Sequence, residues 1–470
     1  MPHSACYLPD PQILQLADFL ADEVAPARFP QHKIRHRDQR HAARVGLDGL
    51  SDEAWAAHMG RFEPLPQNLP APLALRYHGH QFRHYNRDLG DGRGFLYAQL
   101  RAADTGQLLD LGTKGSGETP WSRGGDGRLT LQGGVREVLA ASLLEAHGVE
   151  TCKILSLIET GEALVRYDEP SPTRAGVMVR LSHGHIRIGS FQRLSALGDR
   201  VGLERLLEHA ARLYHPQLGD TNDLPGAFLE AVARALADTA AAWMTSGFVH
   251  GVLNTDNLNV SGESFDYGPW RFLPQCDPAF TAAYFDETGL YAYGRQPGAV
   301  LWGLRRLAEA LAPLDGGRPR EERLSGFAAW YGAAVRRRLL RRLGLRSLGD
   351  TRDAALVRAA SALWSDNPIG FERLVFDWTG GLAAEARAAA SPERRLYRAE
   401  SLLAWRRALE GFEPAAPERL GDPYLAGDRP CTLLIEEVEA IWAAIHSADD
   451  WSLFHQKIAE IDAVRRLYAP

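Results

Sequence analysis

Residues 250–268 read HGVLNTDNLNVSGESFDYG and bring two aspartates and an asparagine into one polar segment. A hard cation such as Mg²⁺ binds oxygen ligands, usually one or two protein groups together with phosphates and waters. Asn257 and Asp266 offer such ligands, and Asp256 is a carboxylate that could accept a proton from a nucleophile. A polar loop whose side chains bond to their own backbone is the alternative. With the features described below, the segment favours a metal-assisted phosphate site.

The spacing of this segment follows the catalytic loop of protein kinases, H-R-D-L-x-x-x-N followed by D-F-G. His250, Leu253 and Asn257 fall at the kinase positions, and Asp266 begins an Asp-Tyr-Gly element. Val252 stands where a kinase has its catalytic aspartate. A chain with this change is either catalytically silent or carries out another reaction.

The composition excludes several classes of protein. The chain has 470 residues, enough for a two-lobed enzyme, and 45% of them are hydrophobic, as is ordinary for a globular protein. The formal net charge of −6 predicts no broad surface for nucleic acid or anionic membranes. No run of about 18 apolar residues occurs, so no membrane span is expected. Four scattered cysteines argue against a zinc site or a disulfide scaffold and favour a cytoplasmic location: Cys6, Cys152, Cys276 and Cys431.

Lysine is rare in this chain. Of the 53 basic residues only four are lysines, at positions 33, 114, 153 and 457. A lysine that is retained among so many arginines favours a position that needs a compact ammonium group. Lys114 stands in the glycine-rich sequence T-K-G-S-G, and we interpret it as the candidate; surface charge explains the other three more simply.

A strand-rich region follows a proline-rich linker. The glycine-rich turn GDGRG at 90–94 precedes two predicted strands, 95–101 and 107–114, and the second strand ends at Lys114. Protein-kinase N-lobes have a glycine-rich loop and a lysine in this order. Most glycine-rich turns bind no ligand. The kinase-like interpretation therefore rests on the order of the elements.

A second glycine cluster, 124–128, is followed by a predicted helix at 133–147. Backbone N–H groups in such turns can bind an anion. In a kinase N-lobe the helix after the lysine strand supplies the glutamate that pairs with the lysine. Glu137 lies in the first turns of the predicted helix, so we predict an ion pair between Lys114 and Glu137. A solvated helix residue near the positive end of the helix dipole is the alternative.

Two arginines lie in otherwise apolar, strand-like sequence. Arg180 and Arg187 flank His183 and His185. Burial of an arginine is costly unless an anion or a carboxylate meets it, and a guanidinium group binds phosphate oxygens in a bidentate manner. Both arginines are therefore candidate phosphate ligands. A metal site at the two histidines is disfavoured, since no carboxylate or third histidine lies nearby in the sequence.

From about residue 199 the pattern becomes helical. Residues 227–245 form a predicted alanine-rich helix that leads into the 250–268 segment, as a kinase C-lobe helix leads into its catalytic loop. We predict an α+β, protein-kinase-like fold: an N-terminal extension at 1–70, a β-rich N-lobe at 71–198 and a larger helical C-lobe at 199–470. Further strands are predicted at 154–158, 163–166 and 177–181, and further helices at 299–312, 322–343, 353–365, 378–391, 394–410, 433–446 and 451–466.

Several long stretches resemble the SelO family, called YdiU in bacteria. The resemblance covers roughly residues 75–300, and beyond about 310 it consists only of length and helical character. The matching stretches are RYHGHQF, NRDLGDGRG, DLGTKGSGETPWSRGGDGR, VREVLA, SLIETGEAL, RLSHGHIRIGSFQR, HGVLNTDNLNVSGESFDYGPWRFL and YFDETGLYAYGRQP.

The resemblance implies a pseudokinase fold that binds ATP in a flipped orientation and transfers AMP, not phosphate, to hydroxyl groups of proteins. It implies that Lys114, Arg180 and Arg187 bind the triphosphate and that Glu137 orients Lys114. Further residues would line the nucleotide site: Gly90, Gly92, Arg93, Asp126 and Gly127. Asp256 would accept the proton in place of the aspartate missing at Val252.

The same resemblance implies that Asn257 and Asp266 hold the metal ion, and Mg²⁺ and Mn²⁺ both suit such oxygen ligands. Many relatives end in a tail with cysteine or selenocysteine, whereas this chain ends RRLYAP. Cys276 matches a cysteine linked to redox control in some bacterial relatives, but disulfide control through the tail is not expected here. Two alternatives stay open: a conventional phosphotransferase with Asp256 as a displaced base, and a catalytically silent ATP-binding scaffold.

Overall fold

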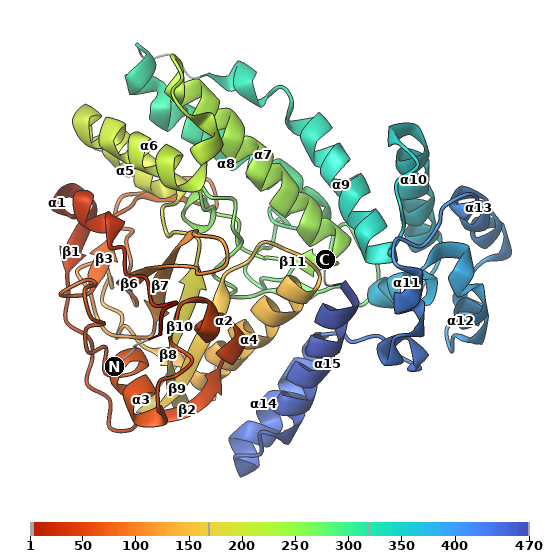
Figure 1. Ribbon diagram of the computed structural model, residues 1–470, viewed down its shortest axis with the longest axis horizontal. Helices are drawn as coiled ribbons and strands as arrows, with labels where there is room; N and C mark the ends of the chain where they lie inside the picture. The colour runs from red at the N-terminus through yellow and green to blue at the C-terminus, as the bar shows by residue number, and fades with distance from the viewer. Residues whose placement is uncertain (1–3, 168–169, 317–319, 469–470) are drawn as a thin grey trace.

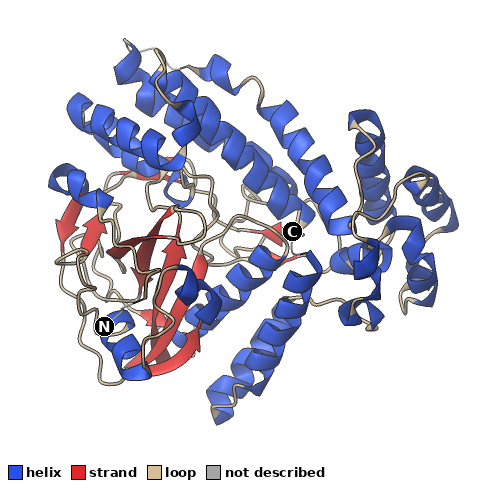
Figure 2. Cartoon of the chain, in the orientation of Figure 1, coloured by secondary structure: helices blue, strands red, loops and turns tan. Residues whose placement is uncertain are grey.

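The computed structural model describes residues 4–167, 170–316 and 320–468. Helices form most of the regular structure, and an antiparallel β-sheet lies against them on one side of the molecule (Figures 1 and 2). The predicted α+β class is confirmed.

The main sheet has eight strands, and seven of them follow the order β1-β3-β6-β7-β10-β9-β2. The predicted strands at 95–101 and 107–114 are confirmed as the hairpin β6–β7, whereas the two expected at 154–158 and 163–166 form one strand, β9. The strands are β1 (Ala21–Glu23), β2 (Lys33–Arg37), β3 (Leu73–Leu75), β6 (Leu96–Arg101), β7 (Leu108–Lys114), β8 (Leu129–Thr130, paired with β10), β9 (Lys153–Leu164) and β10 (Thr173–Ser182).

The N-terminal segment contributes to this sheet at both edges. The β1 strand pairs with β3, and β2 pairs with β9, although no strand was predicted in the N-terminal extension at 1–70. The reason is that β2 reads KIRHR: an edge strand carries charged side chains, which conceal the apolar alternation that marks inner strands. Residues between 29 and 65 cover one face of the sheet and form a core with its inner strands.

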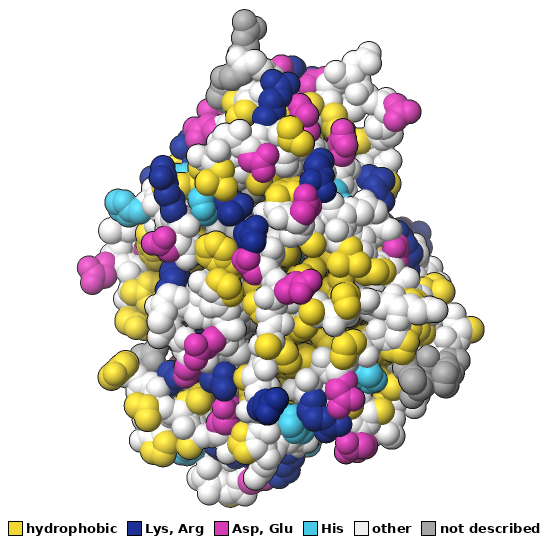
Figure 3. Space-filling view, turned by 90° about the vertical axis from the view of Figure 1, so that its left-hand side faces the viewer, with side chains coloured by type: hydrophobic (Ala, Val, Ile, Leu, Met, Phe, Trp, Pro, Cys, Tyr) yellow, Lys and Arg dark blue, Asp and Glu magenta, His cyan; other side chains and the backbone are white. Residues whose placement is uncertain are grey.

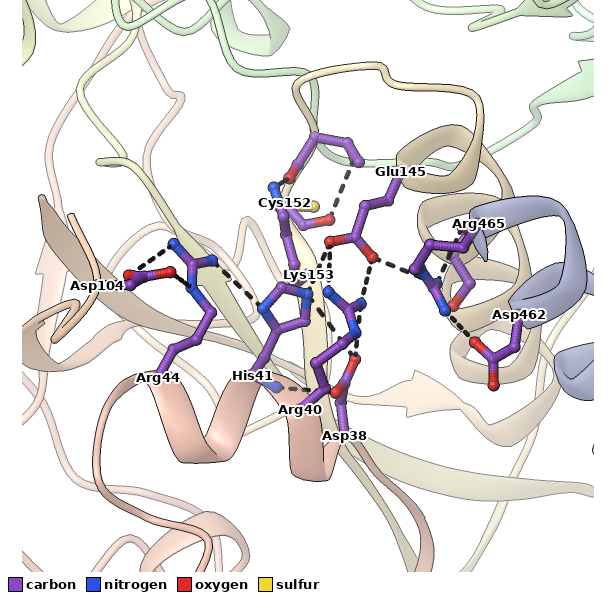
Figure 4. A network of polar contacts seen from close by, with 12 residues as sticks. Asp38, Arg40, His41, Arg44, Asp104, Glu145, Cys152, Lys153, Asp462 and Arg465 are labelled. Atoms are coloured by element: carbon purple, nitrogen blue, oxygen red, sulfur yellow. Dashed lines mark hydrogen bonds and ion pairs between the residues drawn. The ribbon is translucent and has the colours of Figure 1, made fainter. Parts of the chain in front are cut away.

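The helix α2 (Gln39–Arg44) is tied to distant parts of the chain by one carboxylate. Figure 4 shows Arg40 and His41 of α2 directed at Glu145 near the end of α4 (Leu131–Ala146). His41 Nε2 lies 2.8 Å from Glu145 Oε1, and Arg465 of α15 (Ser452–Tyr468) approaches Oε2 to 3.3 Å. Glu145 thus joins the N-terminal segment, α4 and the C-terminal helix.

The helix α4 begins two residues before the predicted start at 133. The hydroxyl of Thr130 accepts a hydrogen bond from the backbone N–H of Gly133 at 3.1 Å and caps the helix. The α4 helix packs against β9 and β10 on one side and against α15 on another. Its position fixes Glu137, which faces the sheet in the core.

Most of the remaining described chain is helical. The long helix predicted at 227–245 is α7 (Leu224–Thr245), capped by the side chain of Asp223. The helix expected at 378–391 is confirmed except at its start: α11 ends at Trp378, and positive φ angles of 99° at Gly380 and 61° at Gly381 separate α11 from a 3-10 helix, Gly381–Ala384, that continues into α12. The helices are α1 (Ala17–Leu20), α3 (Asp52–Met59), α5 (Ile188–Leu197), α6 (Arg200–Tyr214), α8 (Gln296–Leu311), α9 (Phe327–Leu343), α10 (Asp350–Asp366), α11 (Phe371–Trp378), α12 (Glu385–Ala390), α13 (Ala399–Leu409) and α14 (Ile435–Ala448).

Two small hairpin-like pairings lie outside the main sheet. The β4 strand (Gly79–Gln81) pairs with β5 (His84–Asn86), and β11 (Phe248–Val249) pairs with β12 (Arg271–Phe272). The second pair brackets the 250–268 segment and closes it into a loop whose ends are fixed.

The surface shows no large area of a single charge on the face in Figure 3, where acidic and basic side chains alternate around hydrophobic ones. Across residues 4–167, 170–316 and 320–468, none of the helices has the length and apolar character needed to span a bilayer.

Candidate active site

A cavity of about 940 Å³ lies where the sheet, two glycine-rich loops and the 250–268 segment meet. All but one of the predicted site residues line it: Gly90, Gly92, Arg93, Lys114, Asp126, Gly127, Arg180, Arg187, Asp256, Asn257 and Asp266. Glu137 is the exception and lies behind Lys114, with which it forms an ion pair. Residues from four separate parts of the sequence therefore meet at one cavity.

Strand register explains why Lys114 and Arg180 point the same way. The β7 and β10 strands pair with Lys114 opposite Met178, and Arg180 follows Met178 by two residues. Side chains two apart on a strand share a face, as do residues directly opposite each other. The other face of β10 carries Val177 and Val179 into the core beneath the N-terminal segment. The two cations are thus directed away from that core and into the cavity.

Lys114 makes a buried ion pair with Glu137 and a partly buried one with Asp266. Its ammonium group contacts Glu137 and lies 2.8 Å from Asp266 Oδ1, and its side chain is only 5% exposed. The contact with Glu137 confirms the predicted ion pair. The second oxygen of Glu137 is buried and has no hydrogen-bond partner among the described residues, although Arg180 lies 3.9 Å from it. One glutamate therefore holds the lysine and faces the arginine.

Arg180 and Arg187 are both buried, with side chains 8% and 7% exposed. Arg180 NH1 lies 3.3 Å from Asp266 Oδ1, and Arg187 NH2 lies 3.4 Å from Asp91 Oδ1. Burial would lower the pKa of Arg180, but Glu137 and Asp266 raise it above its ordinary value. Both arginines thus stay charged, and they offer the cavity guanidinium groups that bind anions.

Asp266 has an unusual backbone conformation and a strongly acidic carboxyl group. Its φ angle is +63°, a region that residues other than glycine rarely adopt and that is frequent at functional sites. Burial would raise its pKa, yet Lys114, Arg180 and Arg93 hold the pKa of Asp266 well below the ordinary value. The carboxylate is therefore ionised at any physiological pH.

The segment that carries Asp256 and Asn257 is held from both ends. Buried His250 donates through Nε2 to the carbonyl of Phe265 at 3.0 Å, which ties the start of the segment to the residue before Asp266. Asn257 donates from Nδ2 to the carbonyl of Val252 at 3.1 Å. This hydrogen bond fixes the amide of Asn257 and leaves its carbonyl oxygen as an acceptor toward the cavity.

Asp256 is buried and incompletely satisfied. Its Oδ1 has no hydrogen-bond partner among the described residues, and the residue is 8% exposed. Burial raises the pKa of Asp256 to about 6, against the opposing effect of Arg187. A side chain at Gly79 would meet Asp256 Oδ1 at 3.3 Å, so the β4 strand packs directly over the carboxyl group. Asp256 thus lines the cavity with a largely buried carboxyl group whose pKa is raised and whose Oδ1 has no hydrogen-bond partner among the described residues.

The glycine-rich loops pack on each other. A Cβ at Gly90 would come within 2.3 Å of the Trp121 ring, and one at Gly92 within 2.7 Å of the Trp121 carbonyl. Gly127 has a φ of +64°, and a Cβ there would collide with the backbone of Gly117. These glycines are required by close loop packing at the cavity wall. Asp126 lies at the rim, where its carboxylate pairs with Arg166 at 2.8 Å.

Several residues of the cavity wall were not among the predicted site residues, and these include Tyr77, Asp91, Trp121 and Asn254. Asp91 is the second residue of the predicted glycine-rich turn GDGRG, and its position in that turn was the available indication. The Tyr77 ring lies 4.2 Å from the guanidinium carbon of Arg187. This cation–π contact could not be predicted from a sequence pattern.

The two histidines near the arginines have structural partners. His183 Nδ1 donates to the carbonyl of Leu108 at 3.0 Å, and His185 Nδ1 lies 3.1 Å from Asp110 Oδ2. In the described part of the chain, no three His, Cys, Asp or Glu residues cluster as a metal site. Asparagine also supplies an oxygen ligand, and the donor set of the Asp266 carboxylate and the Asn257 amide oxygen at the cavity fits a hard cation that completes its shell with phosphates and waters.

The cavity brings buried cations and carboxylates together, and this arrangement is typical of an enzyme that binds a phosphorylated substrate. The family model described as "Protein adenylyltransferase SelO" matches residues 7–462. The chain belongs to this family and is a nucleotidyltransferase.

Curated relatives match this chain over most or nearly all of its length. A "Protein nucleotidyltransferase YdiU" of Trichodesmium erythraeum is 39% identical over 467 residues, which cover 96% of this chain and 98% of the relative. One of Gloeobacter violaceus is 41% identical over 470 residues, with 98% and 95% covered. One of Synechococcus elongatus is 48% identical over 340 residues, with 72% and 68% covered.

Proposed function

We propose that this chain transfers AMP from ATP to the hydroxyl groups of Ser, Thr or Tyr in proteins and releases pyrophosphate. One observation carries the proposal: Asp256 places a buried carboxylate with an unsatisfied oxygen in the same cavity as the cations Lys114, Arg180 and Arg187. Val252 occupies the usual position of the kinase base, so the reaction needs the base elsewhere.

The cations suit a pyrophosphate leaving group. In the proposed orientation the β- and γ-phosphates lie against Lys114, Arg180 and Arg187, and the α-phosphate faces the acceptor. Negative charge grows on the pyrophosphate as the bond between the α-phosphorus and its bridging oxygen breaks. Donors that are already held in place stabilise such charge without reorganisation, and the ion pairs of Lys114 with Glu137 and Asp266 hold this donor in place.

Asp256 is the proposed general base. The acceptor oxygen forms a bond to the α-phosphorus, pyrophosphate leaves, and the hydroxyl proton goes to the carboxylate of Asp256. A pKa of about 6 leaves most of this carboxyl group ionised at neutral pH and close to the operating pH that favours proton transfer.

Asn257 and Asp266 would hold Mg²⁺ or Mn²⁺ through their oxygen atoms. When bound, such an ion neutralises phosphate charge and helps to align the polyphosphate. Asp266 is suited to this role because its pKa is held well below the ordinary value and its second oxygen is not engaged by Lys114.

We further propose a kinase-like division of the chain into two lobes. A protein-kinase-like arrangement of two lobes, β-rich and helical, with an N-terminal extension is supported by the order glycine turn, lysine strand, glutamate helix and Asp-Tyr-Gly element. The four cysteines are free, which fits the proposed cytoplasmic location. Burial raises the pKa of the Cys276 thiol, so this cysteine is not activated as a thiolate.

The released product tests the proposal. Purified protein with ATP, Mg²⁺ or Mn²⁺ and a mixed protein acceptor should release pyrophosphate, and the Asp266→Ala variant should release none. ADP as the product would instead support a conventional phosphotransferase. ATP binding without any product would support a silent scaffold.

A further inference from the structure

Two large aromatic side chains are exposed together beside the active-site cavity. Tyr284 is 82% exposed and Phe285 is 47% exposed, and their rings meet edge to face at 5.1 Å. Single exposed aromatic residues are common on protein surfaces, but a contiguous apolar patch often marks a binding site. The Phe285 ring continues onto Phe82, 5.8 Å away, and Phe82 onto Tyr291, 5.1 Å away. We call these four side chains the aromatic ledge.

The ledge is held in place by its surroundings. The carboxylate of Asp286 accepts hydrogen bonds from the backbone N–H groups of Leu290 and Tyr291, each at 2.8 Å. Ala282 and Ala283, just before the exposed pair, are buried. The aromatic rings are therefore presented by an anchored turn.

The ledge is connected to the loop that carries Asp256. Asn254 Oδ1 accepts a hydrogen bond from the backbone N–H of Phe82 at 3.0 Å and from the hydroxyl of Tyr291 at 2.8 Å. Asn254 also lines the active-site cavity and precedes Asp256 by two residues. The ledge is thus continuous with the wall of the cavity on the side of the proposed base.

A second, more open cavity of about 680 Å³ adjoins the ledge. Its lining includes Tyr284 and the turn around Asp286 and Thr288. The ledge and this cavity together offer an aromatic surface and space beyond it for a side chain that does not enter the nucleotide cavity.

We propose that the aromatic ledge binds an extended segment of the acceptor protein through an apolar side chain that lies one to three residues from the modified hydroxyl. The proposal rests on the proposed function, because the hydroxyl must reach Asp256. Successive rings of the ledge lie 5.1 to 5.8 Å apart, and an extended chain advances about 3.3–3.6 Å per residue, so a few residues of an extended segment cross the ledge. The ledge then selects acceptors by sequence, while the nucleotide site stays the same for all of them.

A peptide array tests the ledge in two stages. Each peptide has one hydroxyl residue at a fixed position, and a Leu is moved through the flanking positions against a Ser control. Binding of the full-length protein is measured first without ATP, and AMP transfer is then measured after addition of α-labelled ATP. We expect Leu at one flanking position, within three residues of the hydroxyl, to increase binding on the order of tenfold, the value of burying one apolar side chain.

The Tyr284→Ser/Phe285→Ser variant should lose this preference while its affinity for ATP stays unchanged. Leu403→Ser, which alters an exposed apolar residue on α13, is the matched control and should keep it. An equal preference in wild type and the double variant, or no flanking preference in wild-type binding, would overturn the ledge proposal. Binding with the expected preference but without transfer of AMP would overturn the proposed function and leave the ledge standing. A double variant that loses self-association in sedimentation but not the peptide preference would assign the ledge to a second copy of the chain instead.

Discussion

Lys114 and Asp266 are 152 positions apart in the sequence, yet Lys114 Nζ lies 2.8 Å from Asp266 Oδ1. This contact joins the last residue of a sheet strand to the loop between β11 and β12. Glu137 holds the same ammonium group from the other side. A lysine between two carboxylates can exchange one of them for a phosphate without leaving its position, as the proposed polyphosphate site requires.

Replacement of Lys114 by Met should lower AMP transfer on the order of 10²- to 10³-fold, the usual loss when one preorganised donor to developing charge is removed. The variant also leaves Glu137 buried and unpaired, which is destabilising. The Lys114→Met/Glu137→Gln double variant separates the two effects: thermal unfolding should recover toward wild type while activity stays low. Lys33→Met, at a 54% exposed side chain, is the control and should keep full activity.

Replacement of Asp256 by Asn should reduce kcat by about 10²- to 10⁴-fold, because general-base catalysis contributes a factor of this size. The affinity for ATP should change little, since the carboxylate does not pair with the cations that bind phosphate in the proposal. Turnover is compared with ATP affinity from calorimetry, and exposed Asp220→Asn serves as the control. Unchanged kcat in Asp256→Asn would show that the proton leaves by another route.

The sequence predicted the parts of the site that depend on element order and local motif. The Lys114–Glu137 pair follows from a lysine strand followed by a glutamate helix, and the loop of Asp256 follows from the spacing around His250. The partners of Arg187 could not be predicted in this way. Asp91 and Tyr77 reach Arg187 only because separate loops pack together in three dimensions, and such approaches leave no periodicity in the sequence.

The fold was predictable to a similar degree. The hairpin β6–β7 and the helix α7 have clear alternation or helical periodicity. Strand β2 was missed because its edge position allows charged side chains on both faces. The helix expected at 378–391 begins only at Gly381, because Gly380 and Gly381 adopt positive φ angles after the end of α11, and composition alone does not reveal that conformation.

Arg187→Lys should weaken ATP binding by about tenfold or more, although the positive charge is kept. A charge-assisted hydrogen bond contributes about 1.5–3 kcal/mol, and lysine cannot reproduce the planar fork of a guanidinium group. Isothermal titration with ATP measures the effect. The matched control is Arg205→Lys on α6, where the side chain is 41% exposed and pairs with Asp18 at the surface. Equal ATP affinities for Arg187→Lys and wild type would exclude a bidentate contact with phosphate.

Glu145 should make the stability of the protein depend on acid pH. Burial would raise its pKa, but hydrogen bonds from His41 and Arg40 hold the pKa of Glu145 far below the ordinary value of 4.5. A carboxyl group whose pKa is lowered by folding adds stability above its unfolded pKa, and this stability is lost as the pH falls toward the folded value. We therefore expect Glu145→Gln to lower the urea midpoint at pH 7, and the difference from wild type to shrink progressively below about pH 4.5.

Urea unfolding at a series of pH values measures this effect. Glu204→Gln is the control, because it removes an i,i+4 ion pair in which the Glu204 side chain is 48% exposed and the Arg200 side chain 62% exposed. This variant should change the urea midpoint very little at any pH. A Glu145→Gln midpoint that differs from wild type by the same amount at pH 4 and pH 7 would contradict the assigned role of the Glu145 carboxylate.

The central claim is that the α-phosphate of ATP, and not the γ-phosphate, faces the acceptor. The most direct measurement incubates the protein and an acceptor mixture with Mg²⁺ or Mn²⁺ and ATP labelled at one phosphate or the other. We predict label on protein only from α-labelled ATP, with the label lost in Asp266→Ala and strongly reduced in Asp256→Asn. Label transferred from γ-labelled ATP would contradict the claim and identify a phosphotransferase.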